Sequence, residues 1–145
     1  MFVREVMSRC VTECTEDMRL EEVFELIKKC EHGLVVVLDS YAHRVPIGIV
    51  NERSICEQII THGRNPRNLF AGVVIDSHIK TVREDDLVES ISLDETKSVA
   101  AIVVTDANRR VCGILAMNDL RAVRAVTRIP GATEVSKIPA SGWVQ

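Results

Sequence analysis

Two short segments of the chain carry residue types that could hold a small ligand, and both begin in the same way. Residues 113–119 are Gly-Ile-Leu-Ala-Met-Asn-Asp, and residues 48–54 are Gly-Ile-Val-Asn-Glu-Arg-Ser. In each segment a glycine and two β-prone apolar residues precede a helical pattern, so we predict a strand that runs into a helix. A helix N-terminus presents unpaired N–H groups and the positive end of the helix dipole, which attract an anion.

Asp119 distinguishes the second segment from the first, where Ser54 takes the corresponding place. An ionised carboxylate can accept hydrogen bonds from two neighbouring hydroxyls, such as those of a ribose, and a serine hydroxyl cannot. The sequence therefore predicts at most one well-formed site, at Asp119. Both residues also have a structural explanation, because Asp and Ser are favoured helix N-caps, and for Ser54 we prefer that explanation.

Composition limits the classes of function. The chain has 145 residues, 46% of them hydrophobic, which is the size of one compact domain. A net charge of -3 and few aromatic residues argue against nucleic acid as a partner. We find no signal peptide or membrane span and expect a cytoplasmic protein. The five cysteines form no C-x-x-C pair, so we expect reduced, mostly buried thiols and no metal site.

An internal repeat spans most of the sequence. Leu20 corresponds to Leu87 and Asp39 to Asp106 at equal spacing, and Gly48 corresponds to Gly113. Because the period is about half the chain, two repeats must complete each other's core. We predict repeat 1 at residues 1–63, repeat 2 at residues 64–127, and an extended or mobile tail at residues 128–145.

Each repeat has the pattern of a strand, a helix, two strands and a second helix, which predicts a mixed α and β fold. In repeat 1, Asp17 is expected to cap a helix whose apolar face includes Leu20, Val23, Phe24 and Ile27. The apolar runs 34–38 and 45–50 predict paired strands. A stripe of four residues then predicts a helix that ends at a left-handed Gly63. These residues are Ile55, Cys56, Ile59 and Ile60.

Repeat 2 has the same order of elements. Residues 79–82 predict an extended piece, residues 87–93 a helix with a weaker apolar face, and residues 99–104 and 111–115 two strands. The closing helix buries three residues, Leu120, Val123 and Val126.

This ensemble resembles a tandem pair of cystathionine-β-synthase-type (CBS) domains, the Bateman module, over residues 3–127. The resemblance is carried by Val6-Met7-Ser8 before the first extended piece, by valine-rich strands ending in Asp39 and Asp106, and by the two glycine segments. It implies two repeats packed through their sheets about a pseudo-twofold axis, and a disk-like homodimer of such modules. It also implies an adenosyl ligand bound between the repeats: AMP, ADP or ATP, with S-adenosylmethionine or NAD as further candidates.

The family pattern is Gly-apolar-apolar-Thr/Ser-x-x-Asp, from which this chain departs at two places. Ala116 replaces the hydroxyl in repeat 2, which leaves Asn118 as the nearest donor, and Asn51 and Ser54 stand in repeat 1. The resemblance implies a first site at Asp119, Asn118, Ala116, Val99, Ala100, Ala101, Ile79 and Thr81. It implies a weaker second site at Ser54, Asn51, His32, Gly33, Leu34 and Val11. Glu13 would be unfavourable beside a phosphate there. Candidate phosphate contacts are Arg53, Arg121 and Arg124.

We therefore predict a regulatory module that senses an adenosyl ligand and acts on an unidentified protein partner. It is not expected to be an enzyme, because no nucleophile with a base, and no pair of carboxylates, occurs at matching positions of both repeats. A ligand-free dimerisation or scaffold protein with degenerate sites is the alternative. Nucleic-acid binding is the weakest hypothesis, and it would use an arginine face formed by Arg121, Arg124 and Arg128, with Arg109 and Arg110 in a loop.

Overall fold

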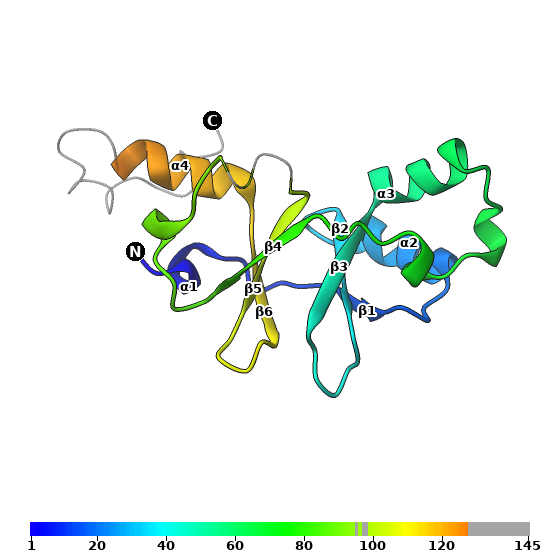
Figure 1. The fold of residues 1–145 in the computed structure, drawn as a ribbon, viewed down its shortest axis with the longest axis horizontal. Helices are drawn as coiled ribbons and strands as arrows, with labels where there is room; N and C mark the ends of the chain where they lie inside the picture. The colour runs from blue at the N-terminus through cyan, green and yellow to red at the C-terminus, as the bar shows by residue number, and fades with distance from the viewer. Residues whose placement is uncertain (95, 97–98, 128–145) are drawn as a thin grey trace.

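The chain forms two halves that lie side by side, each built on a three-stranded sheet (Figure 1). The computed structural model describes residues 1–94, 96 and 99–127. In each sheet the first strand pairs parallel with the second, and the second pairs antiparallel with the third. The strands are β1 (Glu13–Thr15), β2 (Leu34–Leu38) and β3 (Pro46–Asn51) in one sheet, and β4 (Ile79–Arg83), β5 (Ala101–Thr105) and β6 (Val111–Leu115) in the other. The predicted mixed α and β class is confirmed.

Helices and short helical turns connect the strands. The α-helices are α1 (Val3–Val6), α2 (Leu20–Lys29), α3 (Glu52–Cys56) and α4 (Met117–Thr127). A π-helical turn, η1 (Glu57–Thr61), continues α3, and three 3-10 turns are η2 (Pro66–Asn68), η3 (Ala71–Val73) and η4 (Val88–Ser90). No helix in the described ranges is long and apolar enough to cross a membrane.

The central strands β2 and β5 divide their side chains between two cores. Val35 and Val37 pack inside the first half, whereas Val36 faces a cluster between the halves that also contains Val103. Successive side chains of a strand point to opposite faces, so a continuous valine run can fill two cores at once. The cluster between the halves consists of Val36, Leu38, Ile49, Ala101, Val103, Val111 and Ile114. The two repeats therefore complete one core, as the period of the sequence predicted.

The two halves exchange their opening segments. Val3 of α1 is fully buried in the core of the second half, where its N–H donates to the carbonyl of Asp86 at 2.9 Å. In return, Ala71 and Val74 lie in the core of the first half, and the N–H of Leu20 donates to the carbonyl of Leu69 at 3.0 Å. Figure 1 shows α1 beside the sheet of β4, β5 and β6. The repeat boundaries at 1–63 and 64–127 stay a prediction about the sequence. In the folded chain, each half also contains a segment from the other repeat.

This exchange explains the glycine that opens each of the repeated segments. A Cβ atom on Gly113 would lie 2.6 Å from Met7 Sδ and 2.8 Å from the carbonyl oxygen of Ser8. A Cβ atom on Gly48 would lie 2.8 Å from the carbonyl oxygen of Asp76 and would also overlap the Ile75 side chain. Both glycines thus allow the exchanged segment of the other repeat to cross the strand, a packing role that needs no ligand.

The prediction of a helix over residues 87–93 is wrong, because the structure has only the 3-10 turn η4 there. The hydroxyl of Ser90 donates to the carbonyl of Leu87 at 2.7 Å, and that of Thr96 donates to the carbonyl of Leu93 at 2.9 Å. Such local side-chain bonds compete with a helical backbone. Val88 and Ile91 are still buried, so the apolar residues reach the core without a full helix.

Three details of repeat 1 also differ from the sequence prediction. Asp17 does not cap α2, which begins at Leu20 after Arg19, and instead accepts a hydrogen bond from the hydroxyl of Thr15. Phe24 is 42% exposed on the rim of α2. Ile60 is 78% exposed because the chain passes into the π-helical turn η1, whose wider turn rotates the apolar stripe away from the core. Gly63 has φ +64°, the left-handed conformation predicted for the end of this helix.

The cysteines are free, but the prediction that most are buried is wrong. Cys14 is buried, Cys30 and Cys112 are half-buried, and Cys10 and Cys56 are exposed. Cys56 was expected on the apolar face of its helix, but it is exposed at the last residue of α3. The predicted tail, residues 128–145, lies outside the described residues.

Candidate functional site

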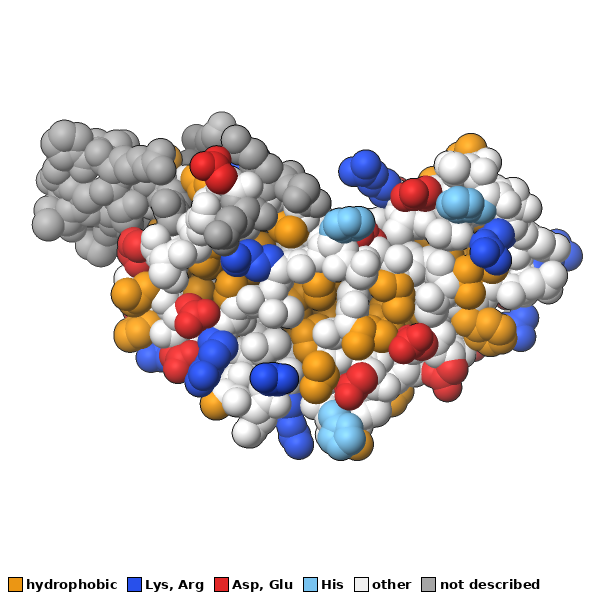
Figure 2. Space-filling model, viewed as in Figure 1, with side chains coloured by type: hydrophobic (Ala, Val, Ile, Leu, Met, Phe, Trp, Pro, Cys, Tyr) orange, Lys and Arg blue, Asp and Glu red, His pale blue; other side chains and the backbone are white. Residues whose placement is uncertain are grey.

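A cleft of about 640 Å³ opens where the first half meets the second. Its walls come from three segments: α3 with η1, the residues before β4, and the residues before β5. The lining residues are Arg53, Ser54, Glu57, Gln58, Ile75, Asp76, Ser77, His78, Val99 and Ala100. We call this the Arg53 cleft. Figure 2 shows acidic, basic and histidine side chains gathered over the α3 region of this face.

A smaller pocket of about 220 Å³ lies at the junction of β6 and α4. It is mostly apolar and also draws on both halves. Its lining residues are His32, Leu34, Ala100, Ala101, Ile114, Leu115, Ala116, Met117 and Asn118. We call this the Asn118 pocket.

The structure regroups the predicted site residues. We predicted Val99 beside Asp119, but it lines the Arg53 cleft with Ser54. We predicted His32 and Leu34 beside Ser54, but they line the pocket of Asn118 and Ala116. The reason is the packing of the two sheets, which brings the start of the central strand of one half against the strand-to-helix turn of the other. Only Ala100 contributes to both cavities.

Several predicted residues lie away from both cavities. Thr81 lines a separate cavity of about 510 Å³ beside Asp106 and Pro46. Val11 and Ile79 are half-buried and pack against the cluster between the halves. The remaining three are Gly33, which is exposed with φ +69°, Arg121, which is exposed on α4, and Arg124, whose side chain is outside the described part.

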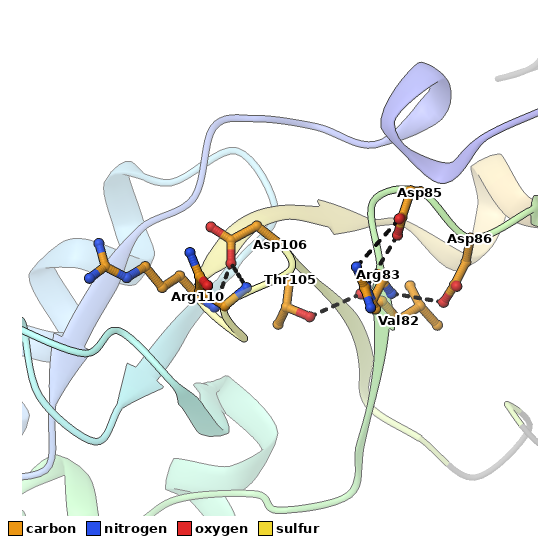
Figure 3. Close-up of polar contacts among 8 residues, drawn as sticks. Val82, Arg83, Asp85, Asp86, Thr105, Asp106 and Arg110 are labelled. Carbon is orange, nitrogen blue, oxygen red and sulfur yellow. Dashed lines mark hydrogen bonds and ion pairs between the residues drawn. The ribbon is translucent and has the colours of Figure 1, made fainter.

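Polar groups at the cavity beside Thr81 already form hydrogen bonds or ion pairs with neighbouring residues, as Figure 3 shows. Asp106 accepts hydrogen bonds from the N–H groups of Asn108 and Arg110, at 2.8 and 3.0 Å. Asp86 accepts from the N–H of Arg83 at 2.9 Å, while the guanidinium of Arg83 lies 3.2 Å from Asp85. These carboxylates hold turns, so Asp106 at the end of β5 has a structural role.

Asn51 and Ser54 are occupied by helix capping. The Asn51 side chain accepts a hydrogen bond from the N–H of Ser54 at 2.8 Å, and Ser54 Oγ accepts from the N–H of Asn51 at 3.0 Å. This reciprocal pair is a capping box at the start of α3. Ser54 therefore takes part in capping, but Asn51 occupies the N-cap position that was predicted for Ser54, and Ser54 is the third helical residue.

Asp119 is the third residue of α4, so it does not occupy the N-cap position. Its side chain is half-buried and makes no hydrogen bond to any other described residue. A carboxylate in the first turn of an eleven-residue helix is favoured by the helix dipole. Asp119 follows Asn118 directly but does not itself line the Asn118 pocket. Its carboxylate remains available to a ligand that extends past the start of α4.

The backbone donors of the Arg53 cleft are mostly taken. The N–H of Ala100 donates to the carbonyl of His78 at 2.7 Å, and the N–H of Val99 donates to the carbonyl of Thr96 at 3.3 Å. The N–H of Asp76 donates to the carbonyl of Ile49 at 2.8 Å. A carbonyl oxygen keeps a second lone pair after accepting one bond. A heterocycle in the cleft can therefore meet acceptors for its amino group more readily than free backbone donors.

The charges of the Arg53 cleft are only partly balanced. Asp76 accepts a hydrogen bond from the N–H of His78 at 2.9 Å and lies 3.1 Å from His78 Nδ1. Arg53 and Glu57 are exposed, and neither side chain makes a hydrogen bond or ion pair with another residue of the described chain. At the weaker second site, we expected the negative charge of Glu13 to be unfavourable beside a phosphate. In the structure Glu13 forms an ion pair with Arg44, and its hydrogen bond raises the pKa of Arg44.

No group of three or more His, Cys, Asp and Glu side chains in residues 1–94, 96 and 99–127 could hold a metal ion.

Comparison with known proteins agrees with this architecture. The CBS domain family model matches residues 3–61. An uncharacterized protein of Methanopyrus kandleri is 30% identical over 97 residues, which cover 66% of this chain and 50% of that protein. The chain therefore spans about half the length of this relative.

Solved structures share the fold over almost the whole chain. A CBS domain-containing protein of unknown function from Bacillus anthracis superposes with a TM-score of 0.73 at 18% identity, covering 89% of this chain and 95% of that chain. The cytosolic domain of the Mg²⁺ channel MgtE, solved in complex with ATP, superposes with a TM-score of 0.63 at 20% identity, covering 81% and 46%. The family model thus shows a CBS domain in the first half of the chain, and the solved structures and the two interleaved sheets show that the chain has the fold of a CBS-domain pair.

Proposed function

We propose that the chain is a regulatory module that binds an adenosyl ligand between its two halves. The observation that carries this proposal is the Arg53 cleft, whose 640 Å³ lies within the roughly 300–1,000 Å³ usual for small-molecule sites. Both halves line it, so an occupant that contacts both favours one relative arrangement of the halves. A sensor needs such a difference in affinity between two arrangements. The ligand candidates remain AMP, ADP, ATP, S-adenosylmethionine and NAD, and the ATP complex of the MgtE cytosolic domain supports this class.

The Asn118 pocket is a second location for the same class of ligand. Its 220 Å³ is below the usual range, which limits it to one ring or a similar group. Asp119 lies next to it in sequence with an unengaged carboxylate that can accept from a ribose. Arg121, one turn along α4 from Met117, is exposed and could meet a phosphate.

Thermal unfolding with each of the five ligands tests the proposal. A ligand that binds only the folded chain stabilises it by roughly 2.7 kcal/mol at 100 times its dissociation constant, or by about 5–10 °C for a chain of this size. We expect at least one ligand to raise the melting temperature. No shift with any of them would refute the proposal and favour the ligand-free scaffold, which Ala116 and the capping role of Ser54 support.

Variants at the two cavities assign the site. Arg53→Ala should weaken binding of a ligand in the Arg53 cleft, and Asp119→Ala should weaken binding of a ligand in the Asn118 pocket. Lys29→Ala, at an exposed position that lines neither cavity, serves as control. A ligand response that survives both Arg53→Ala and Asp119→Ala would place the site elsewhere. Asp119→Ala should leave the fold intact, because its side chain bonds no other described residue.

We also propose a homodimer and a binding role without catalysis. An apolar groove of about 700 Å³ between α2 and α3 is the surface of interest, with Phe24 on its rim. The chain should sediment as a dimer, and Phe24→Glu should shift it toward the monomer if this groove is the contact. A monomer at micromolar concentration would contradict the dimer.

Nucleic-acid binding stays the weakest prediction, since Arg128 lies outside the described residues, and a strong salt dependence of DNA binding would be its signature.

A further inference from the structure

The charges around the Arg53 cleft point to the kind of adenosyl ligand it takes. Four of its lining side chains can carry charge: Arg53, Glu57, Asp76 and His78. The imidazole of His78 is already paired with Asp76, so Arg53 is the cation of the cleft without a partner among the described residues. Two carboxylates therefore face the cavity with one free guanidinium.

The carboxylate of Asp76 cannot turn away from an incoming anion. The backbone of Asp76 exchanges two hydrogen bonds with Ile49, at 3.0 and 2.8 Å, and its side chain is held by the N–H of His78. Only 25% of that side chain is exposed. A negative charge is thus fixed on the wall of the cleft opposite α3 and η1.

Arg53 and Glu57 form the other wall as a cation and an anion one helical turn apart. Residues four apart on a helix project on the same side, so an occupant meets both charges together. One guanidinium can pair with one phosphate or carboxylate through two parallel bonds. A second and third phosphate would then face Glu57 and Asp76 without a further cation from the described chain.

We propose that the Arg53 cleft takes an adenosyl ligand whose 5′ substituent is zwitterionic or cationic, the chemistry of S-adenosylmethionine, and that it discriminates against ADP and ATP. The carboxylate of such a substituent pairs with Arg53, and its positive groups lie toward Glu57 and Asp76. AMP, with a single phosphate for Arg53, ranks between the two classes. This inference rests on the proposed function and adds the charge of the ligand to it.

Isothermal titration of the full chain at low ionic strength, where exposed charges are least screened, tests the ranking. The probes are S-adenosylmethionine, AMP, ADP and ATP, with ATP measured in the presence and absence of Mg²⁺ because the ion neutralises part of its charge. We expect S-adenosylmethionine to bind most tightly and ATP without Mg²⁺ most weakly. ATP binding at least as tightly as S-adenosylmethionine would overturn the inference while leaving the proposed function standing.

Charge-removing variants test whether the cleft is the source of the ranking. Because Glu57 is exposed, Glu57→Gln should change each affinity by only about two- to fivefold, weakening S-adenosylmethionine and strengthening ATP. The matched control is Glu52→Gln, an exposed glutamate on α3 that does not line the cleft. Asp76→Asn, which keeps the hydrogen-bonding oxygen, should shift the ranking in the same direction.

Two outcomes would count against the inference. Equal effects of Glu57→Gln and Glu52→Gln would show that the ranking does not come from the cleft. If none of the four probes binds, the inference fails, and if NAD does not bind either, the proposed function fails with it.

Discussion

At the scale of single residues, Gly113 and Gly48 illustrate how one sequence feature can have two explanations. The sequence places each at the start of a segment that could bind a ligand. The structure shows that each lies under an exchanged segment, where a Cβ atom would overlap Ser8 or Asp76. The glycine of the motif is therefore required by packing, whatever the neighbouring pocket binds.

Gly113→Ala is expected to destabilise the chain by about 1–3 kcal/mol, the usual cost of overpacking. The obstacle includes the backbone oxygen of Ser8, so Met7→Ala should rescue the variant only in part. Thermal or urea unfolding measures the loss. Gly33→Ala is the comparison, because Gly33 has φ +69° with open space around it, and there only backbone strain applies. A fully stable Gly113→Ala would show that the exchanged segment does not press on this strand.

The cysteines should differ in reactivity, because the thiolate is the reactive form. Burial raises the pKa of Cys14 to about 12, whereas Cys10 and Cys56 are exposed. In the native chain at neutral pH, a maleimide should label Cys10 and Cys56 well before Cys14. Mass spectrometry of the labelled peptides reads this directly. Labelling of Cys14 at the rate of Cys56 would contradict its burial.

The same shift predicts a loss of stability at high pH. The folded chain holds the Cys14 proton up to a pKa of about 12, while the unfolded chain releases it near the ordinary value of 9.0. The contribution of Cys14 is complete below about pH 9 and is lost as the pH rises toward 12, because the unfolded state then binds fewer protons. Cys112 acts in the same direction, through burial and then its hydrogen bond with Glu84. Urea unfolding of Cys14→Ala should show a weaker decline above pH 9 than the parent chain.

At the scale of elements, the junction of β3 and α3 is closed by its own side chains. Asn51→Ala removes the acceptor of the Ser54 N–H and should lower stability by about 1 kcal/mol. Asn51→Asp keeps an acceptor at the N-cap and should be nearly neutral. Thermal unfolding compares the two. Equal losses for Ala and Asp would show that capping is not what Asn51 contributes.

The two repeats differ most in the element after their first strand. Repeat 1 has the ten-residue helix α2, and repeat 2 has the three-residue turn η4. Regular apolar spacing and Glu and Lys on the outer face support α2, whereas hydroxyl side chains near η4 satisfy nearby carbonyls. The weaker apolar face of residues 87–93 was visible in the sequence, but the loss of the helix was not predicted from it.

At the scale of the whole molecule, stability depends on the exchange of opening segments. Val3→Ala should cost about 2 kcal/mol, because a fully buried side chain is truncated in the core of the second half. Val74→Ala, in the reciprocal segment, should cost a similar amount, and Val73→Ala, 38% exposed, much less. Urea unfolding of the three variants measures the losses. A neutral Val3→Ala would contradict the packing of α1 on the second half.

Four features were predictable from local sequence patterns: the repeat, the strand at the five-residue apolar run 34–38, the helix with Leu20, Val23 and Ile27 inside, and the left-handed Gly63. These features depend on neighbours a few positions away, which periodicity and turn residues report directly. Six of the predicted site residues line one of the two cavities, whereas Asp119 lines neither, and ligand binding by any of them stays a prediction; the six are Ser54, Val99, Ala100, His32, Leu34 and Asn118.

Which of these residues face the same cavity depends on how the two sheets pack, and local sequence patterns do not contain that information. The family resemblance placed Val99 with Asp119, but the packing of Val36 against Val103 between the sheets brings Val99 to Ser54 instead. The exchange of α1 for residues 69–74 could not be predicted for the same reason. A buried valine gives the same sequence pattern whether it packs in the first half or in the second. Local patterns specify that a side chain is buried. The pairing of surfaces far apart in the chain specifies which residues that side chain packs against.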